Sequence, residues 1–305
     1  MLRATLLRAG ASPFLRRQMS ANPIARRVAG RFIAGDTLDE AEGVVRELSG
    51  QGMSVALDFL GENCTSEGEA NRTTSAYLAA LDRIQEHALD ANVSVKLSAM
   101  GLDLRRDLAM EQVFKVAARA KEVGAMMGVD MESHDYVDRT LAAIDALRQR
   151  YDSEGIGVCL QSYLYRTPDD LAQLNEWRVP VRLVKGAYDE PQEVAFPEKA
   201  QVDDAYATLL ERLIAANPYP MVATHDPAMI RLTKRLVATA GRDRSTFEFQ
   251  MLYGIRRDLQ RQVVDEGYRL RVYVPYGTYW YPYFMRRLAE RPANVGFFVS
   301  SLVRG

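Results

Sequence analysis

Residues 181–188, Val-Arg-Leu-Val-Lys-Gly-Ala-Tyr, are typical of a short apolar strand that ends in polar residues, and a helical stretch follows them. The same kind of unit recurs eight times along the chain. The predicted strands cover residues 54–60, 93–98, 128–132, 157–163, 181–188, 220–225, 246–252 and 270–275. Eight alternating strand–helix units predict an α/β fold of the (β/α)₈ TIM-like barrel type, in which active sites lie at the C-terminal ends of the strands.

Length and composition agree with one large globular barrel. The 305 residues carry a net charge of -1, which argues against a nucleic-acid partner, because dedicated nucleic-acid binders are usually basic. Only two cysteines are present, Cys64 and Cys159, so neither a disulfide framework nor a zinc cluster is indicated, and a reducing, cytoplasmic location is expected. No apolar run approaches the ~20 residues of a membrane-spanning helix.

The N-terminal region has an unusual charge pattern. Seven arginines occur before the first acidic residue, Asp36. This pattern is found in mitochondrial transit peptides and in membrane-surface helices, but we favour a basic helical extension packed on the barrel. We therefore divide the chain into a helical extension, residues 1–50, and a catalytic barrel, residues 51–305. A last helix, which begins at Pro282, is expected to cover the barrel mouth.

Alternation along the strands places polar side chains inside the barrel. Successive residues of a strand face opposite sides, so Ser94 and Lys96 share one face of their strand, as Asp130 and Glu132 share one face of theirs. Arg182 likewise opposes the apolar Leu183. A buried charge without a partner is costly. Polar interior faces on several strands therefore suggest a ligand that supplies partners.

Lys96 is the first candidate for chemistry. Its position near the end of a strand suits an anion ligand or a Schiff-base lysine. The alternative is a structural salt bridge with Asp130 or Glu132. At this end of a barrel we favour a functional role.

The last helix provides a second candidate. Tyr283, Arg286, Arg287 and Glu290 have the spacing of one helical face. Adjacent arginines usually form a solvated face, but residues 276–284 are too aromatic for free surface. Two guanidinium groups beside aromatic walls would form a clamp for a carboxylate.

Other signals are weak. Of three histidines, only His134 and His225 lie near strand ends, so we predict no metal site. Dinucleotide and P-loop motifs are absent from the sequence. Gly186 would allow close approach of a planar ligand. Alternation alone assigns Met131, Phe247, Phe249 and Met251 to the core. Cys159 lies in an apolar strand and is interpreted as a small core residue. These observations predict a barrel enzyme with a basic, tyrosine-rich pocket for a small carboxylate, but not its reaction.

Four segments resemble the proline dehydrogenase family. They are Val93-Ser94-Val95-Lys96-Leu97-Ser98, Arg182-Leu183-Val184-Lys185-Gly186-Ala187-Tyr188, Thr224-His225, and the run from Tyr273 through Tyr283-Phe284-Met285-Arg286-Arg287-Leu288-Ala289-Glu290-Arg291. The matches occur in order between residues 54 and 295, and the R-L-V-K-G-A-Y and Y-x-x-R-R-L motifs together are highly specific. The length is similar to that of the bacterial monofunctional enzymes.

The resemblance implies non-covalently bound FAD and oxidation of L-proline to Δ1-pyrroline-5-carboxylate. Electrons would pass to a membrane quinone, with possible peripheral contact at the inner face of the cell membrane. The implied substrate-binding residues are Lys96, Arg286 and Arg287 for the carboxylate, and Tyr188, Leu252, Tyr273 and Tyr283 around the ring. The implied cofactor-binding residues are Met131, Gln161, Arg182, Val184, Lys185, Gly186, Ala187, Thr224, His225, Gln250 and Glu290.

Two residues receive catalytic roles from the resemblance. Asp130 would orient Arg287 or the substrate amine. Arg182 would lie near the flavin N5, which explains a cation inside the barrel better than a salt bridge does. Two other functions remain open: a Schiff-base aldolase that uses Lys96 or Lys185 on the same fold, and a non-catalytic carboxylate-binding barrel.

Overall fold

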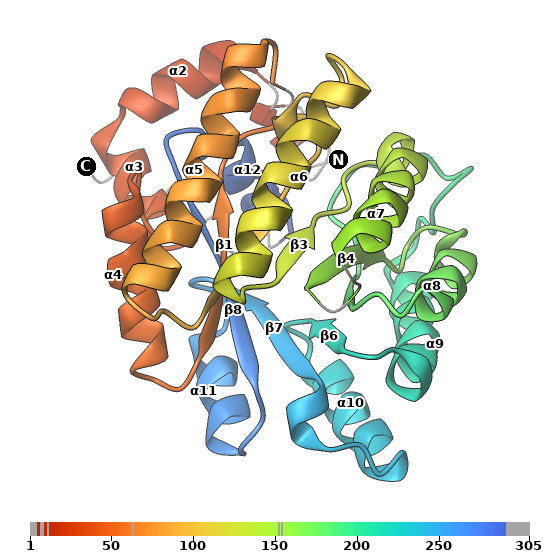
Figure 1. Ribbon diagram of the computed structural model, residues 1–305. Helices are drawn as coiled ribbons and strands as arrows, with labels where there is room; N and C mark the ends of the chain where they lie inside the picture. Colours follow the sequence, from red (N-terminus) through yellow and green to blue (C-terminus); the bar gives the residue numbers. More distant parts are fainter. Residues whose placement is uncertain are drawn as a thin grey trace.

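The computed structural model describes residues 5–290 except 7, 8, 11, 63, 152 and 154. Its parallel strands form one closed barrel in the order of the sequence (Figure 1). The strands are β1 (Ser54–Phe59), β2 (Ala91–Val95), β3 (Met127–Val129), β4 (Ile156–Gln161), β5 (Val181–Val184), β6 (Pro220–Ala223), β7 (Glu248–Leu252) and β8 (Leu270–Tyr276). The predicted (β/α)₈ barrel is confirmed.

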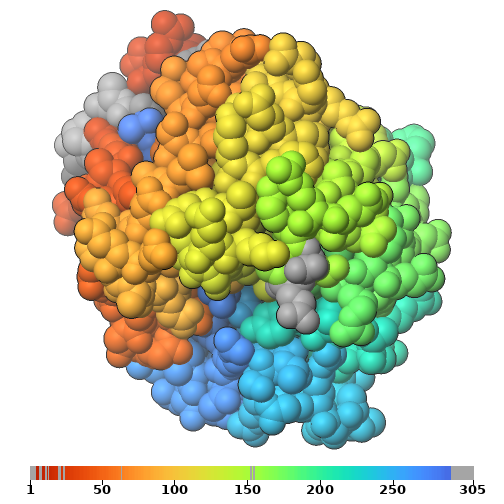
Figure 2. Space-filling view, viewed as in Figure 1, coloured from red at the N-terminus to blue at the C-terminus, as the bar shows by residue number. Residues whose placement is uncertain are grey.

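Helices surround the barrel and cover the outer face of the sheet (Figure 1), and in Figure 2 the orange, yellow and green segments lie against one another on the face shown. They are α2 (Pro13–Ala21), α3 (Pro23–Ala29), α4 (Leu38–Ser49), α5 (Glu67–Glu86), α6 (Arg106–Val123), α7 (Val137–Tyr151), α8 (Thr167–Glu176), α9 (Lys199–Ala216), α10 (Pro227–Thr239), α11 (Arg257–Asp265) and α12 (Tyr281–Glu290). The predicted last helix is therefore present as α12.

Strand alternation sets the core, as β2 illustrates. Val93 and Val95 are fully buried on its outer face and belong to the same apolar cluster as Leu81 and Ile84 of α5. Ser94 faces the other way and donates a hydrogen bond inside the barrel, to Asp130. The predicted alternation on β2 is thus confirmed, and hydrophobic burial fixes which face is inside.

Several strands end earlier than predicted. β3 ends at Val129 and β5 at Val184, so Asp130 and Lys185 lie just beyond the ladder. Backbone bonds still anchor these ends: Asp130 N donates to Val95 O at 2.9 Å, Val184 O accepts from Ser162 N at 2.8 Å, and Lys185 O accepts from Tyr163 N at 3.1 Å. The backbone leaves the sheet where the side chains turn toward the pocket.

A second apolar cluster joins the N-terminal helices to α12. Ala25, Val28 and Phe32 pack with Phe284 and Leu288 of α12, and the rings of Phe32 and Phe284 are 6.1 Å apart. The red N-terminal segment and blue α12 lie side by side in Figures 1 and 2. This packing fixes α12 across the barrel mouth; the division of the chain at residue 50 stays a prediction.

Candidate active site

One large cavity opens at the C-terminal ends of the strands. Its volume is about 620 Å³, within the range of small-molecule and cofactor sites. The lining residues are Lys96, Asp130, Met131, Cys159, Gln161, Arg182, Val184, Lys185, Gly186, Ala187, Tyr188, Lys199, Ala223, Thr224, His225, Asp226, Pro227, Gln250, Met251, Leu252, Arg256, Tyr273, Tyr283, Arg286 and Arg287. This set contains every predicted binding residue except Glu290, whose side chain lies outside the described part of the structure.

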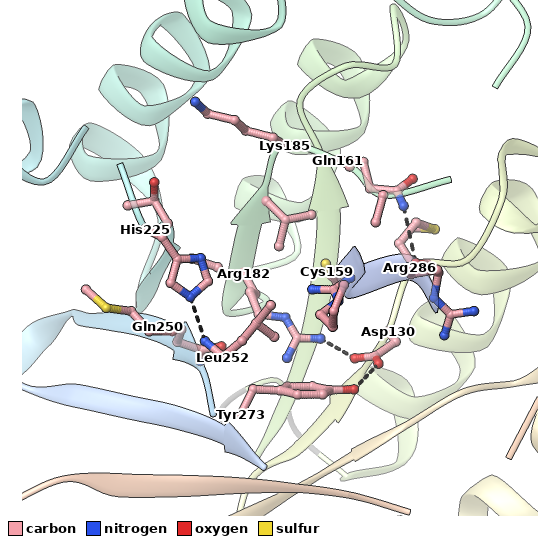
Figure 3. A pocket seen from close by; sticks show the side chains of 18 of the residues that line it. Asp130, Cys159, Gln161, Arg182, Lys185, His225, Gln250, Leu252, Tyr273 and Arg286 are labelled. Carbon is pink, nitrogen blue, oxygen red and sulfur yellow. Dashed lines mark hydrogen bonds and ion pairs between the residues drawn. The ribbon is translucent and has the colours of Figure 1, made fainter. Parts of the chain in front are cut away.

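Asp130 is the centre of a buried polar cluster. Arg182 forms an ion pair with its carboxylate, and Tyr273 donates its hydroxyl to Asp130 Oδ2 at 2.6 Å (Figure 3). Ser94 donates to Oδ1 at 2.5 Å. Burial alone would raise the pKa of Asp130, but Arg182 and Lys96 outweigh it and hold the pKa below its usual value. Asp130 is therefore an ionised carboxylate that orients Arg182 and Tyr273.

This cluster bears on two predictions. Arg182, expected as a flavin partner rather than as a member of a salt bridge, lines the cavity and is also ion-paired with Asp130. Asp130 was expected to orient Arg287 or the substrate amine, and Arg182 and Lys96 are cations paired with its carboxylate. A charge this deeply buried needs a protein partner in the free enzyme, and the roles of both residues toward flavin and substrate stay predictions.

Lys96 lies between two carboxylates. Its Nζ is 2.7 Å from Asp58 Oδ1, 3.1 Å from Asp130 Oδ2 and 3.3 Å from the Tyr273 hydroxyl. Burial would lower the pKa of Lys96, but the neighbouring anions raise it well above its usual value. The lysine is therefore a charged group at the cavity wall, and the salt-bridge and ligand interpretations are both compatible with it.

Glu132, the other proposed partner of Lys96, has a different role. Its carboxylate accepts the Ser98 N–H at 3.0 Å and the Ser98 hydroxyl at 2.5 Å. Burial raises its pKa to about 7. It holds the turn after β2, which carries Lys96 into the cavity.

The two arginines of α12 are not a solvated face. Arg287 is 8% exposed, and the Arg286 side chain is 14% exposed. Arg286 Nη1 donates to Glu62 Oε2 at 2.9 Å, and its guanidinium lies 5.8 Å from the ring centre of Tyr188. The Arg287 guanidinium lies 5.0 Å from the ring centre of Tyr283. A buried arginine pair between tyrosines is suited to bind a carboxylate with both guanidinium groups.

Sequence reasoning missed two acids, Asp58 and Glu62. Asp58 lies near the end of β1 and Glu62 follows that strand, and the sequence shows both only as acids near a strand end. Their partners are Lys96, which follows β2, and Arg286 of α12, so the pairing becomes visible only once the barrel has closed. Burial would raise the pKa of Glu62, but Arg286 lowers it below its usual value.

The assignment of Met131, Cys159, Phe247, Phe249 and Met251 to the core is confirmed, because all five are buried in the main apolar cluster. Met131, Met251 and Cys159 also line the cavity, because the interior of the barrel is open at this end. No group of three or more His, Cys, Asp or Glu among the described residues is arranged to hold a metal ion.

The sequence model described as proline dehydrogenase matches residues 41–300. The chain belongs to the proline dehydrogenase family. Proline dehydrogenase 1 of Bacillus subtilis (strain 168) is 41% identical over 276 residues, which cover 90% of this chain and 91% of that protein. Proline dehydrogenase of Deinococcus radiodurans is 42% identical over 281 residues, 91% of each chain. The prediction of a proline dehydrogenase family enzyme is confirmed.

Solved structures of this family share the fold. The crystal structure of proline utilization A (PutA) from Bdellovibrio bacteriovorus inactivated by N-propargylglycine superposes with a TM-score of 0.82 at 26% identity. The match covers 87% of this chain and 33% of that one, so this proline dehydrogenase family chain spans about a third of the PutA length.

Proposed function

We propose that this protein oxidises L-proline to Δ1-pyrroline-5-carboxylate with non-covalently bound FAD and passes the electrons to a membrane quinone. The observation that carries the proposal is the convergence of two buried arginines, Arg286 and Arg287, with Lys96 on one cavity lined by tyrosines. Three cations at one end and aromatic rings around them match a small cyclic amino acid, whose carboxylate and apolar ring need opposite environments.

Substrate binding would begin at the carboxylate. Arg286 and Arg287 supply planar, paired donors, and Lys96 supplies a point charge. Glu62 already pairs with Arg286, so the substrate carboxylate has to share or displace that acid. Tyr188, Leu252, Tyr273 and Tyr283 line the remaining wall and would hold the pyrrolidine ring.

The cavity has features that fit FAD. Gln161 has a buried Oε1 atom with no hydrogen-bond partner among the described residues, while its Nε2 donates to Met131 O at 3.4 Å. A ligand group in the cavity would supply the missing donor. His225 Nε2 accepts the Leu252 N–H at 2.9 Å and so fixes the strand end beside it (Figure 3).

The remaining cofactor residues would be supplied by three segments. They are Val184 to Ala187 at the end of β5 and after it, Thr224 after β6, and Gln250 on β7; Met131 also lines the cavity. These residues would hold FAD, which would supply the hydride acceptor for oxidation of the proline ring. Arg182 places a permanent positive charge beside this space, which favours an anionic reduced cofactor.

A membrane partner fits the charge of the N-terminal region. Among the residues that the structure describes, no helix is both long and apolar enough to cross a bilayer. Arg17, Arg27 and Arg31 are exposed, and an exposed basic segment is attracted to anionic lipid. We propose that this segment brings the enzyme to the membrane where the quinone resides.

The test is to identify the bound cofactor and the electron acceptor. Purified protein should release FAD on denaturation, and a soluble quinone should be reduced when L-proline is added. Direct reduction of NAD, or a protein that does not bind added FAD, would contradict the proposal. Borohydride trapping of a covalent adduct on Lys96 or Lys185 would support the aldolase alternative instead. Binding of proline without any turnover would support a non-catalytic barrel.

A further inference from the structure

Three loops meet behind one wall of the cavity. They are residues 130–136 after β3, residues 162–166 after β4 and residues 185–198 after β5. The second and third loops are joined by backbone hydrogen bonds: Tyr163 N donates to Lys185 O at 3.1 Å, and Phe196 N donates to Tyr163 O at 2.8 Å. The loop after β5 is therefore held at both of its ends.

Glu190 joins all three loops. Its side chain is only 3% exposed although it belongs to a loop. One carboxylate oxygen accepts the backbone N–H of His134 at 3.0 Å and the hydroxyl of Tyr163 at 3.3 Å, and the other contacts the His134 ring at Nδ1. A buried carboxylate with several partners holds loops together more strongly than an exposed ion pair would.

The same loop supplies part of the cavity wall. Gly186, Ala187 and Tyr188 line the cavity, and Tyr188 lies beside Arg286 of the carboxylate clamp. Gly186 has φ +117°, and a Cβ placed there would come within 2.5 Å of the Tyr163 ring. The wall is therefore packed directly against a residue that Glu190 binds. Glu190, His134 and Tyr163 themselves are not among the lining residues.

We propose that Glu190 is a positioning residue that fixes the wall formed by residues 186–188 and thereby sets the affinity of the site for its substrate. The proposal rests on the proposed function only for the identity of that substrate, L-proline. Glu190 acts through Tyr188 and Gly186 rather than by touching the substrate. Its loss should therefore weaken binding more than it slows the chemical step.

The experiment compares Glu190→Ala with Glu193→Ala, a control at an exposed acid of the same loop. Steady-state kinetics with L-proline and hydrogen exchange of residues 185–198 are measured on the flavin-loaded protein. Glu190→Ala should raise KM about tenfold with little change in kcat, because buried donors lose their acceptor. Exchange in residues 185–198 should accelerate, while the control should match the wild type in both measurements.

Three further variants separate the contributions of the His134 ring and the Glu190 carboxylate. His134→Ala removes the ring but keeps the backbone N–H of residue 134, so its effect on KM should be smaller. Because the two side chains act on one another, the variant that carries both Glu190→Ala and His134→Ala should have a KM only slightly higher than that of Glu190→Ala alone. Glu190→Gln retains an acceptor oxygen and should restore part of the affinity. If Glu190→Ala fails to fold, the single variants His134→Ala and Glu190→Gln carry the test.

Unchanged KM and unchanged exchange would overturn the proposal. So would a loss of thermal stability with normal KM, because that result would make Glu190 a purely structural residue. Failure of the proposed function is distinguishable: the wild type itself would then not turn over L-proline, while the exchange comparison would still report whether Glu190 holds the loop.

Discussion

Replacing Asp58 with asparagine tests the buried charge cluster directly. Asp58 is 0% exposed, and its Oδ1 atom accepts from Lys96 at 2.7 Å. The substitution keeps the size of the side chain and removes one of the two carboxylates that neutralise Lys96. Removing one partner of a buried ion pair typically costs about 3–5 kcal/mol. Because Lys96 keeps Asp130 at 3.1 Å, we expect the lower end of this range, about 3 kcal/mol, in the free energy of unfolding.

Chemical denaturation measures this change, with Asp82→Asn as the control. Asp82 is an exposed acid on α5 that pairs with Arg119. Its substitution should lower the free energy of unfolding by less than about 1 kcal/mol. Equal stabilities of the two variants would refute the view that Asp58 neutralises Lys96.

The same variant makes a prediction about pH. Burial lowers the pKa of Lys96, whereas Asp58, Tyr273, Asp130 and Tyr77 raise it. Without the Asp58 charge the lysine pKa should fall toward or below its ordinary value of about 10.4. In Asp58→Asn, kcat/KM should therefore decline at a lower alkaline pH than in the wild type. If the plots of kcat/KM against pH for the variant and the wild type coincide at alkaline pH, Asp58 has no role in keeping Lys96 charged.

Three further predictions concern single side chains. Arg286→Lys and Arg287→Lys keep the charge but lose paired donors, so the fall in kcat/KM of each variant should correspond to about 2–4 kcal/mol of activation free energy. Near-normal kinetics would remove both residues from the clamp. The pKa of Glu132 is about 7 when folded against 4.5 as the ordinary value, so the folded state retains a proton that the unfolded state loses. Wild-type stability should fall relative to Glu132→Gln as the pH rises between these values, and parallel stability curves would be the contrary result. Tyr273→Ser should lower proline turnover and narrow the preference over hydroxyproline, because an aromatic wall leaves no space for a ring hydroxyl; an unchanged ratio of the two kcat/KM values would make Tyr273 a core residue.

The fold was predictable because burial imposes a local pattern. Each strand presents an apolar face to the helix ring, so alternation is visible in short segments such as Val93–Val95. The ends of the strands were predicted less accurately. Asp130 and Lys185 continue the alternating pattern, but their backbone has already left the sheet. A side-chain pattern does not record where the hydrogen-bonded ladder stops.

The set of cavity residues was largely predictable, but the pairing of charges was not. The aromatic residues 276–284 and the motif resemblance both placed Arg286 and Arg287 at the site, although adjacent arginines usually form a solvated face. Glu62 could not be predicted as the partner of Arg286, because 224 positions separate the two residues and only barrel closure brings them together. Met131 was ambiguous because an interior position can be either core or cavity wall, depending on what fills the barrel mouth.

We propose that this cavity carries out flavin-dependent oxidation of proline. The most direct measurement is the visible absorbance spectrum of the FAD-loaded protein, recorded anaerobically before and after addition of L-proline. We expect the flavin bands to bleach with proline and to return when a quinone is added. A flavin spectrum that stays unchanged at saturating L-proline would contradict it.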